Sequence, residues 1–185
     1  VIHFRGMHFD FSQRYPESFA RFKADDYNCY NNLTEEMNNT IADYDNAILY
    51  NDYLMNQLLE RFKNKDAIAI FIPDHGERVY DFDENFGRSL GFTYNEIIPQ
   101  HEIPMWIWAS DTYISNHTAI WNKIRSTSNK PYMTDAIAHT IMSLAGIKND
   151  MYNSEVDIIS NTYNCKRPRI LRNQANYDSI KHARR

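Results

Sequence analysis

The spacing of apolar and polar residues predicts one long helix in the first half of the chain. Over residues 33–64 the apolar side chains recur at the spacing of a single helix face. They are Met37, Ile41, Tyr44, Ile48, Met55, Leu58 and Phe62. Thr34, followed by Glu35 and Glu36, is typical of the N-cap of such a helix. The segment therefore predicts an amphipathic helix that begins after Thr34.

Short apolar runs predict strands around this helix. Residues 67–72 follow it directly, and residues 102–110 (EIPMWIWAS) form a second run of this kind. Residues 1–4 and 155–160 also have the pattern of short strands, whereas 5–22 and 74–100 are expected to be loops. A second helix is predicted over 134–147, with Thr134 as N-cap and Gly146 just after its end. This order of elements favours an α/β fold with a mostly parallel sheet flanked by helices.

Composition narrows the class of protein. The chain has 185 residues, of which 43% are hydrophobic and 14% aromatic, so it has enough apolar side chains for a packed core. Its formal net charge of −4 gives no reason to expect a nucleic-acid partner. No apolar run approaches the roughly 18 residues of a membrane span, and we expect no signal peptide within these residues.

Charge and cysteines raise two further questions. Residues 165–185 contain seven of the 20 Lys and Arg residues but one of the 24 acidic residues, so we separate them as a basic C-terminal tail from a domain over 1–164. A solvated segment is the simpler interpretation of this tail, and contact with an anionic lipid surface is the alternative.

Cys29 and Cys165 are too few for a disulfide scaffold, and whether they form one bridge stays open.

Candidate chemistry lies where the strand 67–72 ends, at Asp74, His75, Gly76 and Glu77. A carboxylate and an imidazole are both zinc ligands, and Gly76 lets the backbone turn close to an ion. In α/β sheets ligands bind beyond the carboxyl ends of strands, which is the position of this pair. Zinc requires about four ligands, however. The same residues are also common in turns that bind no metal.

Histidines near the start of the chain are the first candidates for the missing ligands. His3 and His8 flank Gly6 after the strand predicted over 1–4. On the long helix, Asp45-Asn46 and Asn51-Asp52 are more simply interpreted as a polar face or as buried groups that tie the helix to loops. His117 and His139 have no neighbours of metal-ligand type, so we expect surface or partly buried side chains.

Several motifs together resemble a known family. They are DHGE after an apolar strand, the preceding YDNAILYNDYLMNQLLERF, the following EIPMWIWASDTY, the opening VIHFRGMHFDFSQRYPESFARF, and MTDAIAHTIMSLAGI with YNCKRPRIL near the end. In this order they resemble the C-terminal half of the periplasmic catalytic domain of phosphoethanolamine transferases, in the alkaline phosphatase/sulfatase superfamily. The resemblance implies that fold, incomplete at its N-terminal side.

The resemblance also implies roles for individual residues. Asp74 and His75 match two ligands of a tightly bound zinc ion. His8 matches a histidine at a second metal or at the substrate phosphate, and His3 matches a histidine on the substrate side. Glu77 closes the motif, where it would order the loop or take part in catalysis.

Two departures from the family pattern accompany these matches. Met7 stands where the family has a serine. The family also has an active-site histidine about a dozen residues beyond DHGE, where this chain reads DFDENFGRSLGF. A second metal site of the usual composition is therefore in doubt.

The implied activity is transfer of phosphoethanolamine from phosphatidylethanolamine to lipid A or lipopolysaccharide core. It would use zinc and a threonine nucleophile upstream of these residues, so the 185 residues alone are expected to be inactive. The implied location is the periplasmic side of a bacterial inner membrane, behind an upstream membrane anchor. Two alternatives are another hydrolase of the superfamily, either a sulfatase or a phosphodiesterase, and a non-catalytic domain that binds lipid or a partner.

Overall fold

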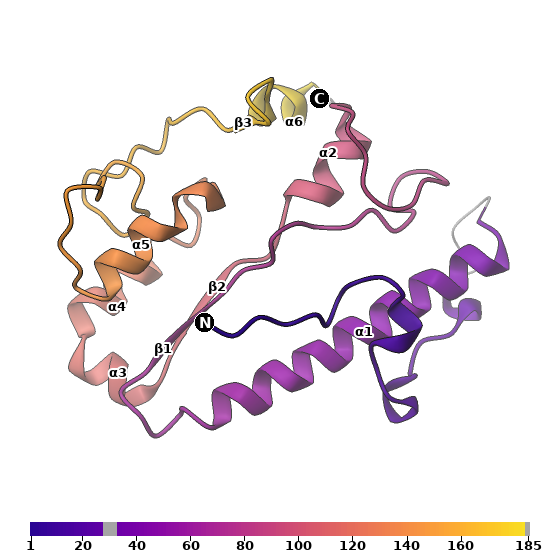
Figure 1. Cartoon of the computed structure of the whole chain (residues 1–185), viewed down its shortest axis with the longest axis horizontal. Helices are drawn as coiled ribbons and strands as arrows, with labels where there is room; N and C mark the ends of the chain where they lie inside the picture. The colour runs from indigo at the N-terminus through magenta and orange to yellow at the C-terminus, as the bar shows by residue number, and fades with distance from the viewer. Residues whose placement is uncertain (28–32, 184–185) are drawn as a thin grey trace. The chain divides into compact units, whose positions relative to one another are not determined.

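The structure, a computed structural model, describes residues 1–27 and 33–183 (Figure 1). Its contacts divide the chain into two compact units. The first unit contains Val1–Lys63 and Phe71–Trp106, and the second contains Asn64–Ile70 and Ile107–Arg185. Cys29 lies outside the described residues, and Cys165 is exposed, so the question of a bridge stays open.

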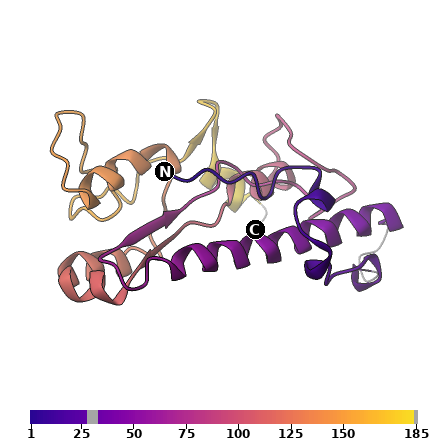
Figure 2. The same cartoon turned by 60° about the horizontal axis from the view of Figure 1, so that its bottom comes forward.

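The first unit is built on the predicted long helix, α1 (Glu35–Glu60). Thr34 is its N-cap, as expected, because its hydroxyl accepts a hydrogen bond from Met37 N at 3.2 Å. The N-terminal segment lies along α1 (Figures 1 and 2). It contains three 3₁₀ turns, η1 (Phe11–Gln13), η2 (Glu17–Phe19) and η3 (Ala24–Tyr27). Phe11 and Ala47 form the buried core here with Val79.

The buried face of α1 differs from the predicted apolar face. Its buried residues are Asn38, Ala42, Asn46 and Ala47. Ile41 and Tyr44 of the predicted face pack against the core, whereas Ile48 of the same face is 42% exposed. Small and amide side chains face inward because the N-terminal segment packs closely against the helix, and Asn46 supplies that segment with hydrogen bonds.

Asn46 joins α1 to the N-terminal segment, as its simpler interpretation predicted. The residue is 1% exposed. Its Oδ1 accepts from Arg21 N and from Phe22 N, both at 2.8 Å, and its Nδ2 donates to Phe22 O at 3.0 Å. A buried amide with all these partners stabilises the loop rather than performing chemistry.

Two predictions for the first unit were wrong. Residues 1–4 form no strand, and Val1 and Ile2 are exposed because no strand pairs with them among the described residues. The loop predicted over 74–100 ends in a helix, α2 (Tyr94–His101). Glu96 closes a capping box there, accepting hydrogen bonds from Thr93 N at 3.0 Å and Thr93 Oγ1 at 2.6 Å.

The two predicted central strands are present and pair with each other. They are β1 (Ile68–Phe71) and β2 (Trp106–Ala109). The rings of Phe71 and Trp106 stack with their centroids 5.1 Å apart. The other pair of named strands, β3 (Ile170–Leu171) and β4 (Ala175–Asn176), is antiparallel and was not predicted. A larger, mostly parallel sheet remains a prediction.

The second unit contains a series of short helices. They are α3 (Asp111–Asn116), α4 (Thr118–Arg125), η4 (Thr134–Ala136), α5 (Ile137–Leu144) and α6 (Tyr177–His182). Its core is formed by Ile124, Ile158 and Ile159, with Ile68 and Ile107 packed against them. The strand predicted over 155–160 is absent, because this segment turns and directs its isoleucines into the core.

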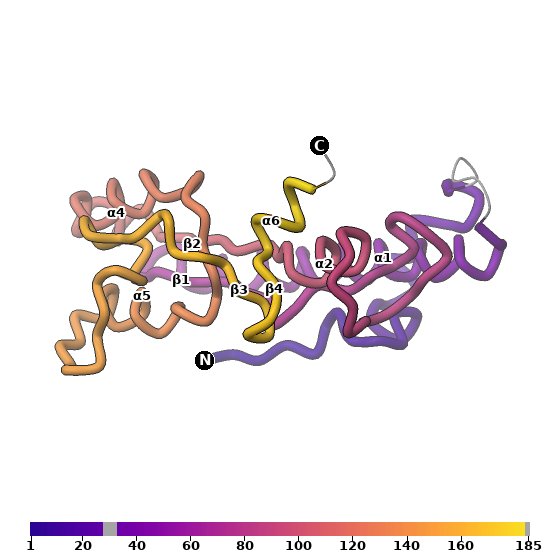
Figure 3. Tube along the Cα trace, turned by 90° about the horizontal axis from the view of Figure 1, so that it is seen from above, coloured from indigo at the N-terminus to yellow at the C-terminus, as the bar shows by residue number. Residues whose placement is uncertain are grey.

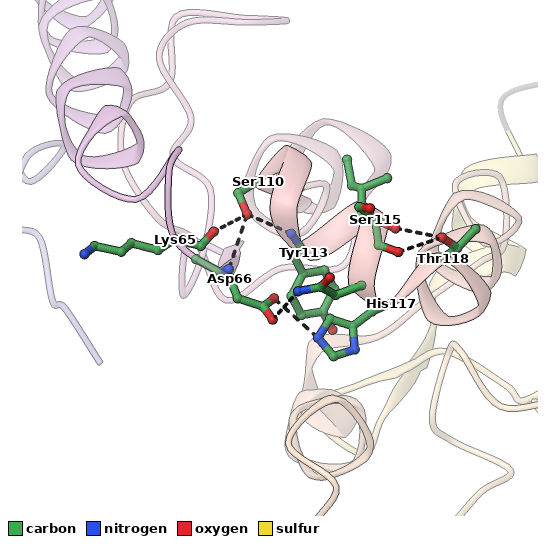
Figure 4. A network of polar contacts seen from close by, with 10 residues as sticks. Lys65, Asp66, Ser110, Tyr113, Ser115, His117 and Thr118 are labelled. Atoms are coloured by element: carbon green, nitrogen blue, oxygen red, sulfur yellow. Dashed lines mark hydrogen bonds and ion pairs between the residues drawn. The ribbon is translucent and has the colours of Figure 1, made fainter.

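A polar network fixes the chain just before β1 (Figure 4). Ser110 is the N-cap of α3, and its Oγ donates to Lys65 O at 2.5 Å while accepting from Tyr113 N at 3.1 Å. Asp66 lies 3.3 Å from Nε2 of His117 and accepts from Asn116 Nδ2 at 3.0 Å. His117 is therefore a partly buried structural residue, as expected.

The remaining predictions for the second unit have mixed outcomes. Thr134 lies inside η4, and Ala136 precedes α5, so the predicted N-cap was wrong. Gly146 was predicted correctly. Its φ is +66°, and Ile147 N donates to Met142 O, which closes the helix end in the way glycine favours.

Residues 165–183, predicted to be a basic tail, contain β3, β4 and α6 (Figure 3). Arg167 pairs with Asp135 at 2.5 Å, and Arg169 pairs with Asp178. Both arginines are therefore neutralised within the second unit. Whether these residues act as a separate tail stays a prediction.

Candidate metal centre

The turn after β1 is held against the end of α2 in the first unit. Gly76 N donates to Gln100 O at 2.9 Å. A Cβ atom at Gly76 would lie 2.0 Å from the backbone oxygen of Pro99, so no larger residue fits without moving the turn. Glycine is therefore required by close approach, and it sets the position of Asp74 and His75 immediately before it.

The imidazole of His75 is oriented by the backbone of the next residue, Gly76. Nδ1 lies 2.8 Å from Gly76 O, which can only accept, so Nδ1 carries the proton and Nε2 presents a lone pair. Nε2 lies 3.7 Å from Oδ2 of Asp74, whose side chain is 87% exposed. Metal-ligating histidines usually donate their other ring N–H to a carbonyl or carboxylate in this way. The pair fits two zinc ligands in donor type and in orientation.

A third side chain, Arg88, reaches His75 from a hairpin that the sequence did not predict. Its Nη1 lies 3.3 Å from His75 Nε2. Val79 and Phe86 pair as an antiparallel bridge, and Gly87, with a φ of +78°, donates its N–H to Arg78 O at 2.8 Å. Residues 78–87 thus fold back on themselves and return the chain to the DHGE turn.

Gln100 connects the two loops that carry His75 and Arg88. Its carbonyl accepts from Gly76 N, and its side-chain Oε1 accepts from Ser89 N at 2.9 Å. Gln100 is 5% exposed and lies in the last turn of α2. One buried residue therefore sets the position of both sides of the candidate site.

Glu96 adds a second connection from α2 to the loop after Arg88. Its carboxylate accepts from Ser89 Oγ at 2.6 Å and from both the hydroxyl and the N–H of Thr93. These bonds favour the charged form and lower the pKa of Glu96 from 4.5 to about 2, and the positive charge of Arg78 adds to the effect.

The other predicted site residues do not join this pair to form a ligand cluster. Among the described residues, no group of three or more His, Cys, Asp or Glu side chains is placed to hold a metal ion. His3 and His8 are exposed, and His8 Nδ1 lies 2.6 Å from Phe9 O. The side chain of Arg14 donates to His8 O at 2.6 Å. Within 1–27 and 33–183, the carboxylate of Glu77 has no hydrogen-bond partner.

Sequence reasoning missed Arg88, Gln100 and Glu96. The capping-box spacing of Thr93 and Glu96 was a signal for α2, although Pro99 inside the helix argued against it. No local signal shows that the hairpin brings Arg88 to His75.

Comparison with known proteins decides the family. A family model described as Sulfatase matches residues 1–147. The chain belongs to the sulfatase family. It is 32% identical over 118 residues to Kdo(2)-lipid A phosphoethanolamine 7''-transferase of Escherichia coli K12, and 28% identical over 164 residues to phosphoethanolamine transferase EptC of the same organism. These relatives confirm the resemblance to phosphoethanolamine transferases.

Solved structures of phosphoethanolamine transferase domains also match this chain. The C-terminal periplasmic domain of EptC from Escherichia coli, crystallised in complex with Zn, matches with a TM-score of 0.78 and 26% identity, covering 96% of this chain and 51% of that one. The soluble domain of lipooligosaccharide phosphoethanolamine transferase A from Neisseria meningitidis shares the fold, with a TM-score of 0.59 and 21% identity. The match with the EptC domain confirms the predicted sulfatase-like fold.

The sulfatase-family chain is short beside its relatives. It spans 20% of the first of the two E. coli proteins and 27% of the second. Within residues 1–27 and 33–183, no helix has the length and apolar character needed to cross a membrane.

Proposed function

We propose that this sulfatase-family chain is part of a zinc-dependent phosphoethanolamine transferase. Its donor is phosphatidylethanolamine, and its acceptor is lipid A or lipopolysaccharide core. The observation that carries the proposal is the orientation of His75, whose Nδ1 is occupied by Gly76 O and whose Nε2 is turned toward Asp74. This ligand pair lies in a chain that matches a domain crystallised with Zn.

In this proposal Asp74 and His75 hold the zinc ion through a carboxylate oxygen and Nε2. Bound zinc supplies a Lewis acid that lowers the pKa of a hydroxyl group bound beside it. The described residues offer two ligands, so the remainder of the coordination shell comes from elsewhere in the protein. His8 and His3 interact with the phosphoryl group of the substrate, and Glu77 orders the loop of the motif or takes part in proton transfer.

The reaction is a double transfer. A threonine hydroxyl loses its proton and attacks the phosphorus of phosphatidylethanolamine, diacylglycerol leaves, and phosphoethanolamine remains on the threonine. A hydroxyl or phosphate oxygen of the acceptor then takes the group and frees the threonine. The matched structure is about twice as long as this chain, and we assign the nucleophile to a segment outside residues 1–185. On this assignment the 185 residues alone are inactive.

The location follows from the same relatives. The matched EptC domain is described as periplasmic. We propose that this domain also faces the periplasm, next to the inner membrane that holds its lipid donor, with an anchor outside the described residues. No nucleic acid takes part.

Lipid A from cells that express the complete protein provides the test. Mass spectrometry is expected to find phosphoethanolamine on lipid A or core with the wild type and to find little or none with Asp74→Asn. A tryptic threonine peptide carrying phosphoethanolamine would identify the nucleophile. Unchanged lipid modification by Asp74→Asn would refute the proposal.

A non-catalytic domain that binds lipid or a partner is the second candidate. It is favoured by the absence of a third metal ligand among the described residues and of a histidine in residues 81–92. Retained zinc with no covalent intermediate in the complete protein would support this candidate. Another sulfatase-family hydrolase would instead release phosphate, sulfate or an alcohol without an acceptor.

A further inference from the structure

We propose that Arg88 binds the anionic oxygens of the substrate phosphoryl group beside His75. The inference rests on the proposed function, because it assumes that the phosphoryl group enters next to the Asp74–His75 pair. It assigns a role to a residue that neither the DHGE motif nor the metal pair includes.

The position of Arg88 is fixed by the backbone on both of its sides. Gly87 is bonded to Arg78 O at 2.8 Å, and Ser89 is bonded to the buried side chain of Gln100 at 2.9 Å. The side chain itself is exposed. Arg88 therefore combines a fixed backbone with an exposed side chain that a ligand can reach from solvent.

Arg88 differs in its polar contacts from the two arginines that form ion pairs in the second unit. Arg167 and Arg169 each pair with a carboxylate. Among residues 1–27 and 33–183, the side chain of Arg88 has one hydrogen-bond partner, which is Nε2 of His75. Its guanidinium group therefore forms no ion pair with a carboxylate within these residues.

The contact with His75 explains why an anion is the expected ligand. A metal ion at Nε2 would occupy the lone pair that Arg88 contacts, and the guanidinium group would then have a second cation as its neighbour. Neighbouring cations repel each other, and an anion between them would remove that repulsion. A guanidinium group donates two parallel hydrogen bonds to a phosphate, so a phosphoryl group satisfies both charges.

The position of Arg88 in the sequence also favours this role. The resemblance expects an active-site histidine about a dozen residues beyond DHGE, and this chain has none there. Arg88 is the cation in that region, and the hairpin 78–87 brings it to His75.

Titration calorimetry with inorganic phosphate on the zinc-loaded complete protein tests this role. Arg88→Ala is expected to weaken phosphate binding roughly tenfold or more, since hydrogen bonds to charged groups contribute that much. The phosphate affinity of Arg88→Lys should lie between those of the wild type and Arg88→Ala, because lysine keeps the charge but cannot donate two parallel hydrogen bonds. Arg61→Ala, an exposed arginine at the end of α1, is the matched control and should bind phosphate as the wild type does.

Zinc content and thermal unfolding are measured on the same samples. Arg88 variants that keep their zinc and their melting temperature but bind phosphate weakly would support the proposal. Unchanged phosphate affinity in a folded Arg88→Ala protein would overturn it. Loss of zinc in both Arg88→Ala and Arg88→Lys would overturn it as well, since Arg88 would then act by positioning His75.

Failure of the transferase function has a different signature. In that case the wild type leaves lipid A unmodified and forms no threonine adduct. If phosphate binding still depends on Arg88 under those conditions, the anion site stands and the proposed reaction is wrong.

Discussion

At the scale of single residues, the candidate site depends on two contacts of α2. The carbonyl of Gln100 receives the N–H of Gly76, and its side chain receives the N–H of Ser89. The carbonyl of Pro99 leaves no room for a side chain at Gly76. The backbone and a buried amide thus position the Asp74–His75 turn and the loop that contains Arg88.

Gly76→Ala should separate the turn from α2. The new methyl group would lie 2.0 Å from a backbone oxygen that cannot rotate away. We expect a loss of about 1–3 kcal/mol in the free energy of unfolding together with reduced zinc content, measured by denaturant titration and elemental mass spectrometry.

Gly6→Ala is the comparison for this variant. Its new Cβ would meet Oδ1 of the Asn51 side chain at 2.6 Å, and a side chain can move aside. We expect a smaller loss of stability and unchanged zinc. Equal effects of the two substitutions would contradict the role assigned to Gly76.

At the scale of elements, α1 and α2 each hold a long loop of the first unit in place through polar side chains. Asn46 of α1 forms hydrogen bonds with the N-terminal segment. Glu96 and Gln100 of α2 form hydrogen bonds with the loop that contains Arg88. In both cases a polar side chain on a helix substitutes for the backbone partners that the loop lacks.

Asn46→Ala should release the segment around Arg21 and Phe22. Two N–H groups and one carbonyl lose their partner, so the free energy of unfolding should fall by about 1–3 kcal/mol. Asn56→Ala, at an exposed position of the same helix, controls for helix propensity and should have little effect. Both are measured by chemical denaturation, and similar losses would show that the hydrogen bonds of Asn46 contribute little.

Glu96 should make stability depend on pH in the acid range. Its folded pKa of about 2 lies below the ordinary value of 4.5, so the carboxylate stabilises the folded state at pH values above 4.5. This contribution is lost as the pH falls from 4.5 toward 2. Glu96→Gln should therefore lower the melting temperature at pH 7, and the difference from wild type should shrink as the pH approaches 2. A difference that is independent of pH would contradict this account.

The elements also show what the sequence could predict. Thr34 and Gly146 were predicted correctly because their caps depend on a few neighbouring residues. Thr134 was predicted wrongly as an N-cap, because a 3₁₀ turn precedes α5 and contains this residue. Residues 1–4 and 155–160 were predicted wrongly, since an apolar run does not reveal whether a partner strand exists. The motif residues Asp74 and His75 could be chosen from sequence, but Arg88 could not. Its place depends on the hairpin 78–87 and on Gln100, which are tertiary features.

At the scale of the whole molecule, the family is established by comparison, whereas the activity is proposed. The match over residues 1–147 establishes the sulfatase family. The zinc site, the threonine intermediate and the lipid substrates are proposals about the complete protein. This chain covers about half of the matched EptC domain. The central claim is that Asp74 and His75 bind zinc.

The most direct test is the zinc content of the complete protein, measured by elemental mass spectrometry for the wild type, His75→Ala and His182→Ala. His182 is an exposed histidine of α6 and serves as the matched control. We expect about one tightly bound zinc ion per chain in the wild type and in His182→Ala, and a loss of that zinc in His75→Ala. Zinc that is absent from the wild type, or that remains in a folded His75→Ala protein, would contradict the assignment and leave Asp74 and His75 as residues of a turn.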